Sequence, residues 1–147
     1  MRRFRFRLQS ILDLRVHEEE QRRLELGAIT SRYNTVAEAI AARREERRQM
    51  LSSRPAAVEG TDIHWRSAVE YYALRLKNEA DRLEEQLLVL EQERRVATDR
   101  YREARQKAEV LRKLREKRER AYIEEFRRAE QKILDEVAQS IHTRGGR

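Results

Sequence analysis

The stretch SSRPAAVEGT, Ser52 to Thr61, holds the only proline of the chain and one of its four glycines. Proline and glycine both interrupt helices, and the sequence on either side is rich in helix-forming residues. Thr61 is a suitable N-cap, and Asp62 follows at a position where the helix dipole favours an anion. The stretch therefore predicts a turn at residues 52–61 between a helix at about 4–51 and a helix at about 62–141, with a frayed tail at 142–147.

The second predicted helix carries apolar or small residues at steps of three or four. A repeat close to 3.5 residues is typical of a left-handed coiled coil, and this one is too regular for a disordered chain. We expect a local stutter where Tyr72, Leu76 and Ala80 follow one another in two steps of four. The predicted seam consists of Val69, Tyr72, Leu76, Ala80, Leu83, Leu87, Leu90, Arg94, Ala97, Tyr101, Ala104, Ala108 and Leu111.

The first predicted helix carries a weaker and more charged stripe with the same spacing. A short connection favours antiparallel neighbours, and the small residues between Ala97 and Ala108 allow a close approach of the two backbones. We therefore predict an all-α fold: a single domain formed by an antiparallel two-helix coiled-coil hairpin with a longer C-terminal helix. The stripe of the first helix consists of Leu26, Ile29, Tyr33, Val36, Ile40, Arg43, Arg47 and Met50.

The two predicted helices differ in length, at roughly 70 Å and roughly 120 Å for a rise of 1.5 Å per residue. With a pivot near Ala57, residue 4 would lie beside about residue 110, and Leu111 to Ile141 would have no partner in the chain. This segment nevertheless continues an apolar stripe, and exposed apolar surface usually marks an interaction site. We expect another molecule to cover it, with self-association as the alternative. The stripe consists of Leu111, Leu114, Tyr122, Phe126, Ala129, Ile133, Val137 and Ile141.

The charge pattern points to an acidic partner. The chain has a net charge of +7, and its 41% charged and 6% aromatic residues argue against an ordinary globular core. One basic cluster is formed by Arg2, Arg3, Arg5 and Arg7, and another by RKLREKRER, Arg112 to Arg120; the hairpin brings the two side by side. Crowded like charges are costly, so the site is suited to an acidic partner. The ordinary alternative is a solvated face with internal i,i+4 pairs.

The sequence carries no pattern that supports catalysis. It contains no cysteine, its three histidines are far apart, and it has neither a phosphate-binding loop nor an H-E-x-x-H motif. A two-helix hairpin also lacks a pocket in which carboxylates could acquire perturbed pKa values. We therefore expect no enzymatic activity, cofactor, metal ion or small-molecule substrate.

Two other readings of the basic ends are less favoured. The opening MRRFRFRLQSILDLR could begin a transit peptide or a membrane-surface helix, but Asp13 and the run from Glu18 to Glu20 fit neither. Basic clusters could also neutralise nucleic-acid phosphates. However, glutamates are interleaved throughout, and RKLREKRER follows the seam, whereas the basic region of a bZIP protein precedes its zipper. This pattern therefore argues against nucleic acid as a partner.

Three stretches, in order, resemble the flagellar FliJ family. FRFRLQSILDLRVHEEEQRRLEL, Phe4 to Leu26, resembles the F-x-L-Q-x-x-L-x-x-R opening of its members and the Glu-rich helix that follows. WRSAVEYYALRL, Trp65 to Leu76, resembles the aromatic stretch after the turn of the family. RRAEQKILDEVA, Arg127 to Ala138, resembles its C-terminal E-x-K-x-x-D-E-x-A signature. Chain length and hairpin organisation are also similar over the whole chain.

The resemblance implies a soluble component of the flagellar type III protein-export apparatus, cytoplasmic and peripheral at the cytoplasmic face of the inner membrane. FliJ proteins are similar to the two-helix stalk of rotary ATPase gamma subunits. The terminal half of the hairpin would insert into the hexameric export ATPase, and another face would contact the cytoplasmic domain of the export gate, with export chaperones as further partners. The alternatives are the equivalent stalk of a virulence secretion system and a basic coiled-coil adaptor for nucleic acid.

The candidate contact residues fall into two groups. Tyr72 and Leu76 also lie in the seam, where core packing is an equal interpretation, whereas Trp65 and Tyr71 lie off it and are expected to be exposed. By position, the resemblance implies Tyr72, Leu76 and Leu83 as export-gate contacts, with Tyr71 in place of Tyr72 if the alignment is shifted by one residue. Trp65 and Tyr71 are added as gate contacts because they lie off the seam. The ATPase-ring contacts expected from the basic ends and the unpaired stripe are Arg2, Arg3, Phe4, Arg5, Phe6, Leu8, Leu114, Tyr122, Phe126, Ile133, Leu134 and Val137.

Overall fold

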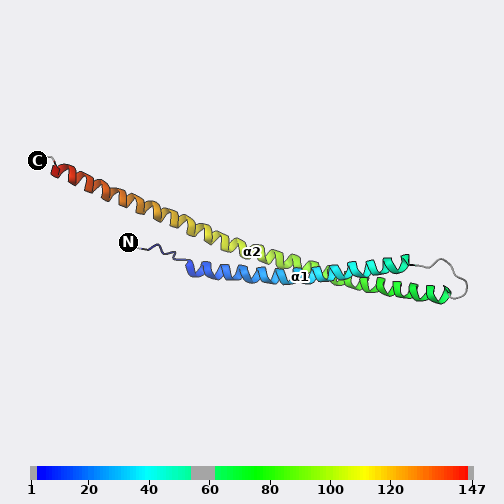
Figure 1. The fold of residues 1–147 in the computed structure, drawn as a ribbon. Coiled ribbons are helices and arrows are strands. Elements are labelled where there is room, and N and C mark those ends of the chain that lie inside the picture. Colours follow the sequence, from blue (N-terminus) through cyan, green and yellow to red (C-terminus); the bar gives the residue numbers. More distant parts are fainter. Residues whose placement is uncertain (1–2, 54–61, 146–147) are drawn as a thin grey trace. The chain divides into compact units, whose positions relative to one another are not determined.

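The computed structural model describes residues 3–53 and 62–145. Its regular structure in these residues is entirely helical and consists of α1 (Gln9–Ser52) and α2 (Asp62–Gly145) (Figure 1). The two helices pack against each other, so the predicted all-α hairpin with a longer C-terminal helix is confirmed, at 44 and 84 residues. Most of the predicted turn lies outside the described residues, as do the Thr61 cap and the side chain of Asp62.

The chain divides into two compact units, to which both helices contribute. The hairpin unit comprises Glu20–Arg102, and the arm unit comprises Met1–Glu19 together with Glu103–Arg147. The expectation of a single domain stays a prediction.

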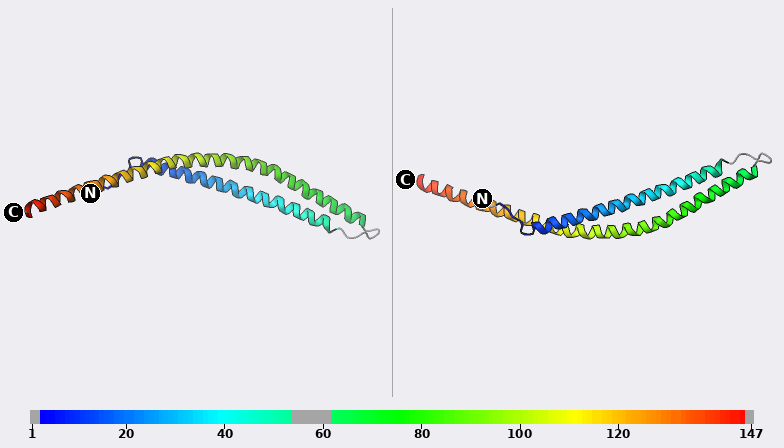
Figure 2. Two further views of the ribbon diagram at one scale, coloured as in Figure 1. Left: turned by 90° about the horizontal axis from the view of Figure 1, so that it is seen from above. Right: turned by 90° about the horizontal axis from the view of Figure 1, so that it is seen from below.

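The core of the hairpin unit follows a strict coiled-coil repeat along α2. In this unit, every predicted seam residue from Val69 to Ala97 is buried or half-buried. The two helices of the unit lie side by side in every view (Figures 1 and 2). The structure adds Ala73, whose side chain is only 4% exposed. With Ala73 in place of Tyr72, the buried positions alternate between steps of four and three, so the predicted stutter is wrong. This spacing keeps one face of α2 against α1.

Side-chain pairs fix the register of the two helices within the hairpin unit. The Arg43 guanidinium lies 3.2 Å from a Glu79 carboxylate oxygen, and Arg44 pairs with Glu84. The Arg94 guanidinium lies over the Tyr33 ring, 4.4 Å from its centroid. A pivot near Ala57 would instead have placed Arg43 opposite Tyr71, about eight residues earlier on α2. The predicted register is therefore wrong, and each residue of α1 pairs further along α2 than expected.

The arm unit begins with a non-helical segment, the N-terminal arm (residues 3–8). The helix starts at Gln9 rather than near residue 4, and the Gln9 N–H donates to the Phe6 carbonyl at 3.1 Å. Along the arm, exposed arginines alternate with less exposed apolar residues. A period of two is typical of extended backbone, in which successive side chains point to opposite faces. The predicted helical start is wrong, because residues 3–6 have no regular structure and Arg7 and Leu8 form the turn that leads into α1. The alternating residues are Arg3, Phe4, Arg5, Phe6, Arg7 and Leu8.

The core of the arm unit is narrow. It is formed by Phe6, Leu12, Ala104 and Ala108, and the Ala108 side chain is 0% exposed. One of the predicted small residues, Ala108, is thus the most enclosed position of this core, as expected where two helical segments pack closely.

The C-terminal limb (residues 127–145) is exposed at every residue. It continues as helix to Gly145, so the predicted fraying from residue 142 is wrong. The prediction that the chain lacks a partner from Leu111 onward is also wrong, because Leu111, Leu114, Tyr122 and Phe126 are half-buried. Within the arm unit, α2 runs on past the N-terminal arm with no other described segment beside it (Figures 1 and 2). The free limb is therefore shorter than expected.

In the described ranges, neither helix has an apolar stretch long enough to span a bilayer.

Candidate interaction surfaces

The N-terminal arm is held on α2 by aromatic contacts. The ring centroids of Phe4 and Tyr122 are 5.6 Å apart at an interplanar angle of 46°, a tilted arrangement that aromatic pairs favour. The Arg118 guanidinium lies 6.0 Å from the centroid of Phe6, which is itself 8% exposed. Among the predicted ring-binding residues, these contacts join Phe4 of the arm to Tyr122 of α2, while Phe6 lies beside Arg118 and Leu8 is half-buried.

The spacing of the seam explains why two arginines of α2, Arg115 and Arg118, occur where the N-terminal arm lies along this helix. If the alternating steps of four and three continue beyond Leu111, the next two seam positions are Arg115 and Arg118. Both are exposed, because a long cationic side chain keeps its charged head in water. At this level of α2 the partner is the extended arm rather than a helix.

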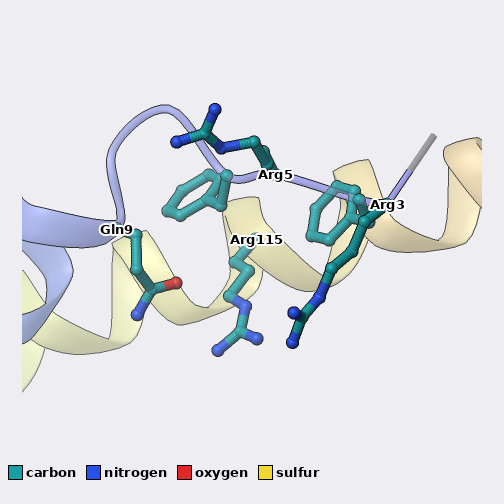
Figure 3. Close-up of a pocket in the computed structure, with 6 residues that line it drawn as sticks. Arg3, Arg5, Gln9 and Arg115 are labelled. Atoms are coloured by element: carbon teal, nitrogen blue, oxygen red, sulfur yellow. The ribbon is translucent and has the colours of Figure 1, made fainter.

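The arm and α2 together form a basic hollow of about 510 Å³. Arg3 and Arg115 extend to the same side, as does Gln9 from the start of α1, whereas Arg5 extends to the other side of the arm (Figure 3). The Gln9 amide donates to Asp13 at 2.8 Å. The lining contains three arginines and no carboxylate: Arg3, Phe4, Arg5, Phe6, Gln9 and Arg115. The predicted proximity of the two basic clusters is therefore confirmed, while Arg2 lies outside the described residues.

The arginines of the two basic clusters differ in how their charge is balanced. Arg112 lies 2.5 Å from Glu19, and this hydrogen bond raises the pKa of Arg112. Arg120 lies 3.7 Å from Glu116. By contrast, Arg3, Arg5 and Arg115 form no ion pair with any described residue. Within Arg112 to Arg120, some arginines are thus paired along the helix, as in the alternative of a solvated face with internal i,i+4 pairs. The charge of Arg115 is not compensated in this way.

The C-terminal limb presents an apolar stripe. Leu134 and Ile141 are 62% and 66% exposed, and Ile133 and Val137 are also exposed. Their spacing of three, four and seven residues places all four on one side of a helix. No described segment of the chain covers them, so the ring-binding residues Ile133, Leu134 and Val137 are open to a partner.

The five predicted gate residues occupy different environments. Tyr71 and Trp65 are 72% and 51% exposed, Tyr72 and Leu83 are half-buried, and Leu76 is 2% exposed within the core. The Tyr72 hydroxyl donates to Glu46 at 2.6 Å, and this bond to a carboxylate raises the pKa of the phenol. Core packing therefore accounts for Leu76, and an interhelical hydrogen bond for Tyr72.

Two exposed residues near Tyr71 were missed by the sequence reasoning. Ile63 and Leu74 are 74% and 54% exposed and lie eight residues before and three residues after Tyr71. Steps of three, four or eight keep residues on one helix face, and this face points away from the seam. We call Ile63, Tyr71 and Leu74 the outer patch. A shallow hollow beside it is lined by Tyr71, Leu74, Arg75, Asn78, Glu79 and Arg82. The signal was present in the sequence as apolar residues out of phase with the seam.

A scan against protein families matches the flagellar FliJ protein family over residues 4–147. The chain belongs to the FliJ family. The match includes the N-terminal arm, both helices and the C-terminal limb. No curated protein and no solved structure gave a significant match. FliJ proteins form an export-adaptor family of the flagellum that is not known for catalysis, and they interact with components of the export apparatus. In the described part of the chain, no group of three or more acidic, histidine or cysteine side chains could hold a metal ion.

Proposed function

We propose that this FliJ-family chain is the stalk of the flagellar protein-export apparatus, inserting into the hexameric export ATPase and contacting the export gate. The observation that carries the proposal is the C-terminal limb, which exposes Ile133, Leu134, Val137 and Ile141 and has no covering segment in the described chain. A ring that encloses this helix would remove that apolar surface from water.

The arm unit would provide the ring contacts. The limb supplies the apolar stripe, and the basic hollow supplies uncompensated charge from Arg3, Arg5 and Arg115. An acidic lining of the ring would pair with these arginines, which would steer association more than it would strengthen it. Phe4, Phe6 and Tyr122 would act mainly by positioning the arm, because they already pack on one another or on α2.

The hairpin unit would provide the gate contacts. Among the predicted residues, Trp65 and Tyr71 have the exposure that a docking residue needs, and the outer patch adds Ile63 and Leu74. Exposed aromatic and aliphatic side chains of this kind form the anchors of many protein interfaces. Leu76 and Leu83 would contribute by keeping α2 straight against α1.

The proposed location is the cytoplasm, with the chain peripheral at the cytoplasmic face of the inner membrane through its partners. Export chaperones are further proposed partners. The family description names the flagellum, which favours the flagellar apparatus over the equivalent stalk of a virulence secretion system. Pairing of arginines with nearby glutamates along α1 and α2, as in Arg23 with Glu20, neutralises part of the basic surface and so argues against the nucleic-acid adaptor.

The two proposed contacts can be tested separately by size-exclusion chromatography with the cognate export ATPase and with the cytoplasmic domain of the export gate. Leu134→Glu with Val137→Glu should abolish association with the ATPase and leave the gate complex intact. Tyr71→Ala with Leu74→Ala should do the opposite. Gln139→Glu, which places a negative charge on the opposite face of the limb, is the matched control and should preserve both complexes. Loss of both complexes in either double variant, with helicity retained, would overturn this division of surfaces.

A further inference from the structure

The basic hollow gathers three arginines, and none of them forms an ion pair with a described residue. Elsewhere, arginines are commonly neutralised by a glutamate three or four residues away, as in Arg22 with Glu25 at 2.9 Å and Arg48 with Glu45 at 2.6 Å. Arg115 has Glu119 four residues ahead, yet the two form no ion pair. Together with Arg3 and Arg5 it leaves three positive charges around one hollow. This arrangement is unfavourable unless an anion reduces the repulsion.

The hollow is also structurally defined before any ligand binds. The arm that carries Arg3 and Arg5 is held by Phe6, which is 8% exposed, and by the contact of Phe4 with Tyr122. The Gln9 N–H to Phe6 carbonyl bond fixes the bend into α1. A fixed arm reduces the entropy lost when its arginines are immobilised on a ligand.

The geometry selects among anions. Arg3 and Arg115 come from two different segments and extend to the same side (Figure 3). A single carboxylate has two oxygens and satisfies one guanidinium in the bidentate mode, whereas a phosphate chain has enough oxygens for two guanidiniums at once. The volume of about 510 Å³ falls in the range of small-ligand sites.

We propose that the hollow between the N-terminal arm and α2 binds a small multivalent phosphate anion of the triphosphate class, held by Arg3 and Arg115 and attracted by the field of Arg5. The site goes beyond the stalk role and does not depend on it, because the ligand binds to the isolated chain. It shares Arg3 and Arg5 with the proposed ring contact, so an occupied site would compete with an acidic partner for the same guanidiniums.

The test is isothermal titration calorimetry of the full chain with inorganic tripolyphosphate at near-physiological salt. Arg115→Gln and Arg3→Gln should each weaken binding by about tenfold or more, since each removes a bidentate charge-assisted contact. Arg105→Gln is the matched control, because Arg105 is an exposed arginine of α2 that also has no ion pair in the described residues. It makes the same change in net charge and should alter the affinity less than about twofold. Arg115→Lys keeps the charge and should still lose affinity.

Three outcomes would overturn the proposal. Absence of binding by the unmodified chain would exclude the site. Equal weakening by Arg115→Gln and Arg105→Gln would show that only net charge matters. Tighter binding of polyglutamate, or of vesicles containing an anionic phospholipid, than of tripolyphosphate would show that the hollow is a docking surface for an acidic protein or a membrane. None of these results involves the export ATPase, so failure here leaves the stalk proposal to its own test.

Discussion

The ring centroids of Phe4 and Tyr122 lie 5.6 Å apart, although the two residues are 118 positions apart in the sequence. This contact joins the N-terminal arm to α2. This contact, with that of Phe6, converts the first residues of the chain from a helical extension into a segment that lies along another helix. It also decides where the free part of α2 begins, because the half-buried residues of α2 end at Phe126, four residues after Tyr122.

Phe6 should be the main anchor of the arm. Phe6→Ala removes a side chain that is 8% exposed and should lower the free energy of unfolding by about 1.5–3 kcal/mol, the value of burying a phenylalanine. Urea denaturation followed by circular dichroism measures this. Ile11→Ala, at a residue that is 44% exposed in the same unit, should cost clearly less. Equal effects of the two substitutions would show that the arm is not anchored through Phe6.

Ala108 should tolerate no larger side chain. It is 0% exposed, so Ala108→Leu would force the packed backbones apart and should destabilise the fold by about 1–3 kcal/mol. The control is Val110→Leu, a change of similar chemistry at a residue that is 62% exposed, which should be nearly neutral. Thermal unfolding of both variants decides the matter, and an unchanged midpoint for Ala108→Leu would contradict the close packing described for this unit.

The hydrogen bond from Tyr72 to Glu46 should make stability depend on pH in the alkaline range. The bond raises the pKa of the folded phenol above its ordinary value of about 10. Its stabilising contribution is therefore fully present below that ordinary value and is lost as pH rises through the folded-state pKa. Tyr72→Phe should lower the denaturation midpoint at neutral pH and make less difference at high pH. In a spectrophotometric titration, Glu46→Gln should lower the pKa of Tyr72; an unchanged titration would refute the bond.

The ion pair of Arg112 with Glu19 should contribute more than the exposed pairs along α1. The Glu19 side chain is 14% exposed and lies 2.5 Å from Arg112, whereas Glu25 is 50% exposed in its pair with Arg22. Glu19→Gln should therefore reduce the free energy of unfolding by up to about 1 kcal/mol, and Glu25→Gln by a few tenths at most. Denaturation in low and high salt checks this, because screening should diminish the difference. A larger loss for Glu25→Gln would contradict the assignment.

Much of the fold could be predicted because one physical rule governs a coiled coil. Spacing at 3.5 residues places Val69, Leu76, Ala80 and Leu90 on one face, and all four are buried. Tyr72 and Ala73 both fit the spacing to within one residue, but Ala73 is the buried one and Tyr72 is half-buried. Which of two adjacent residues packs against the partner helix is not specified by the spacing alone.

The register and the arm could not be obtained in the same way. Helical periodicity does not specify which turn of α1 faces which turn of α2, so the offset of Arg43 toward Glu79 depends on interhelical pairs. Phe4, Leu8 and Ile11 have helical spacing, but Phe4, Phe6 and Leu8 equally have the spacing of an extended segment. In a short segment the two periods cannot be separated without knowing what surface lies beside it.

The candidate contact residues divide along similar lines. Exposure of Trp65 and Tyr71 followed from their position off the seam, and the structure has both exposed. Leu74 lies between the seam residues Ala73 and Leu76, so its apolar side chain is easily counted with the seam. Its exposure of 54% follows only once Ala73 and Leu76 are known to be the buried positions.

The central claim is that the C-terminal limb is the part of the chain that a ring-shaped ATPase encloses. The most direct measurement compares stimulation of ATP hydrolysis by the cognate export ATPase with the full chain and with a chain ending at Phe126. The truncated chain keeps every half-buried residue of α2 and should remain folded by circular dichroism, yet it should give no stimulation. Full stimulation by the folded, truncated chain would contradict the account.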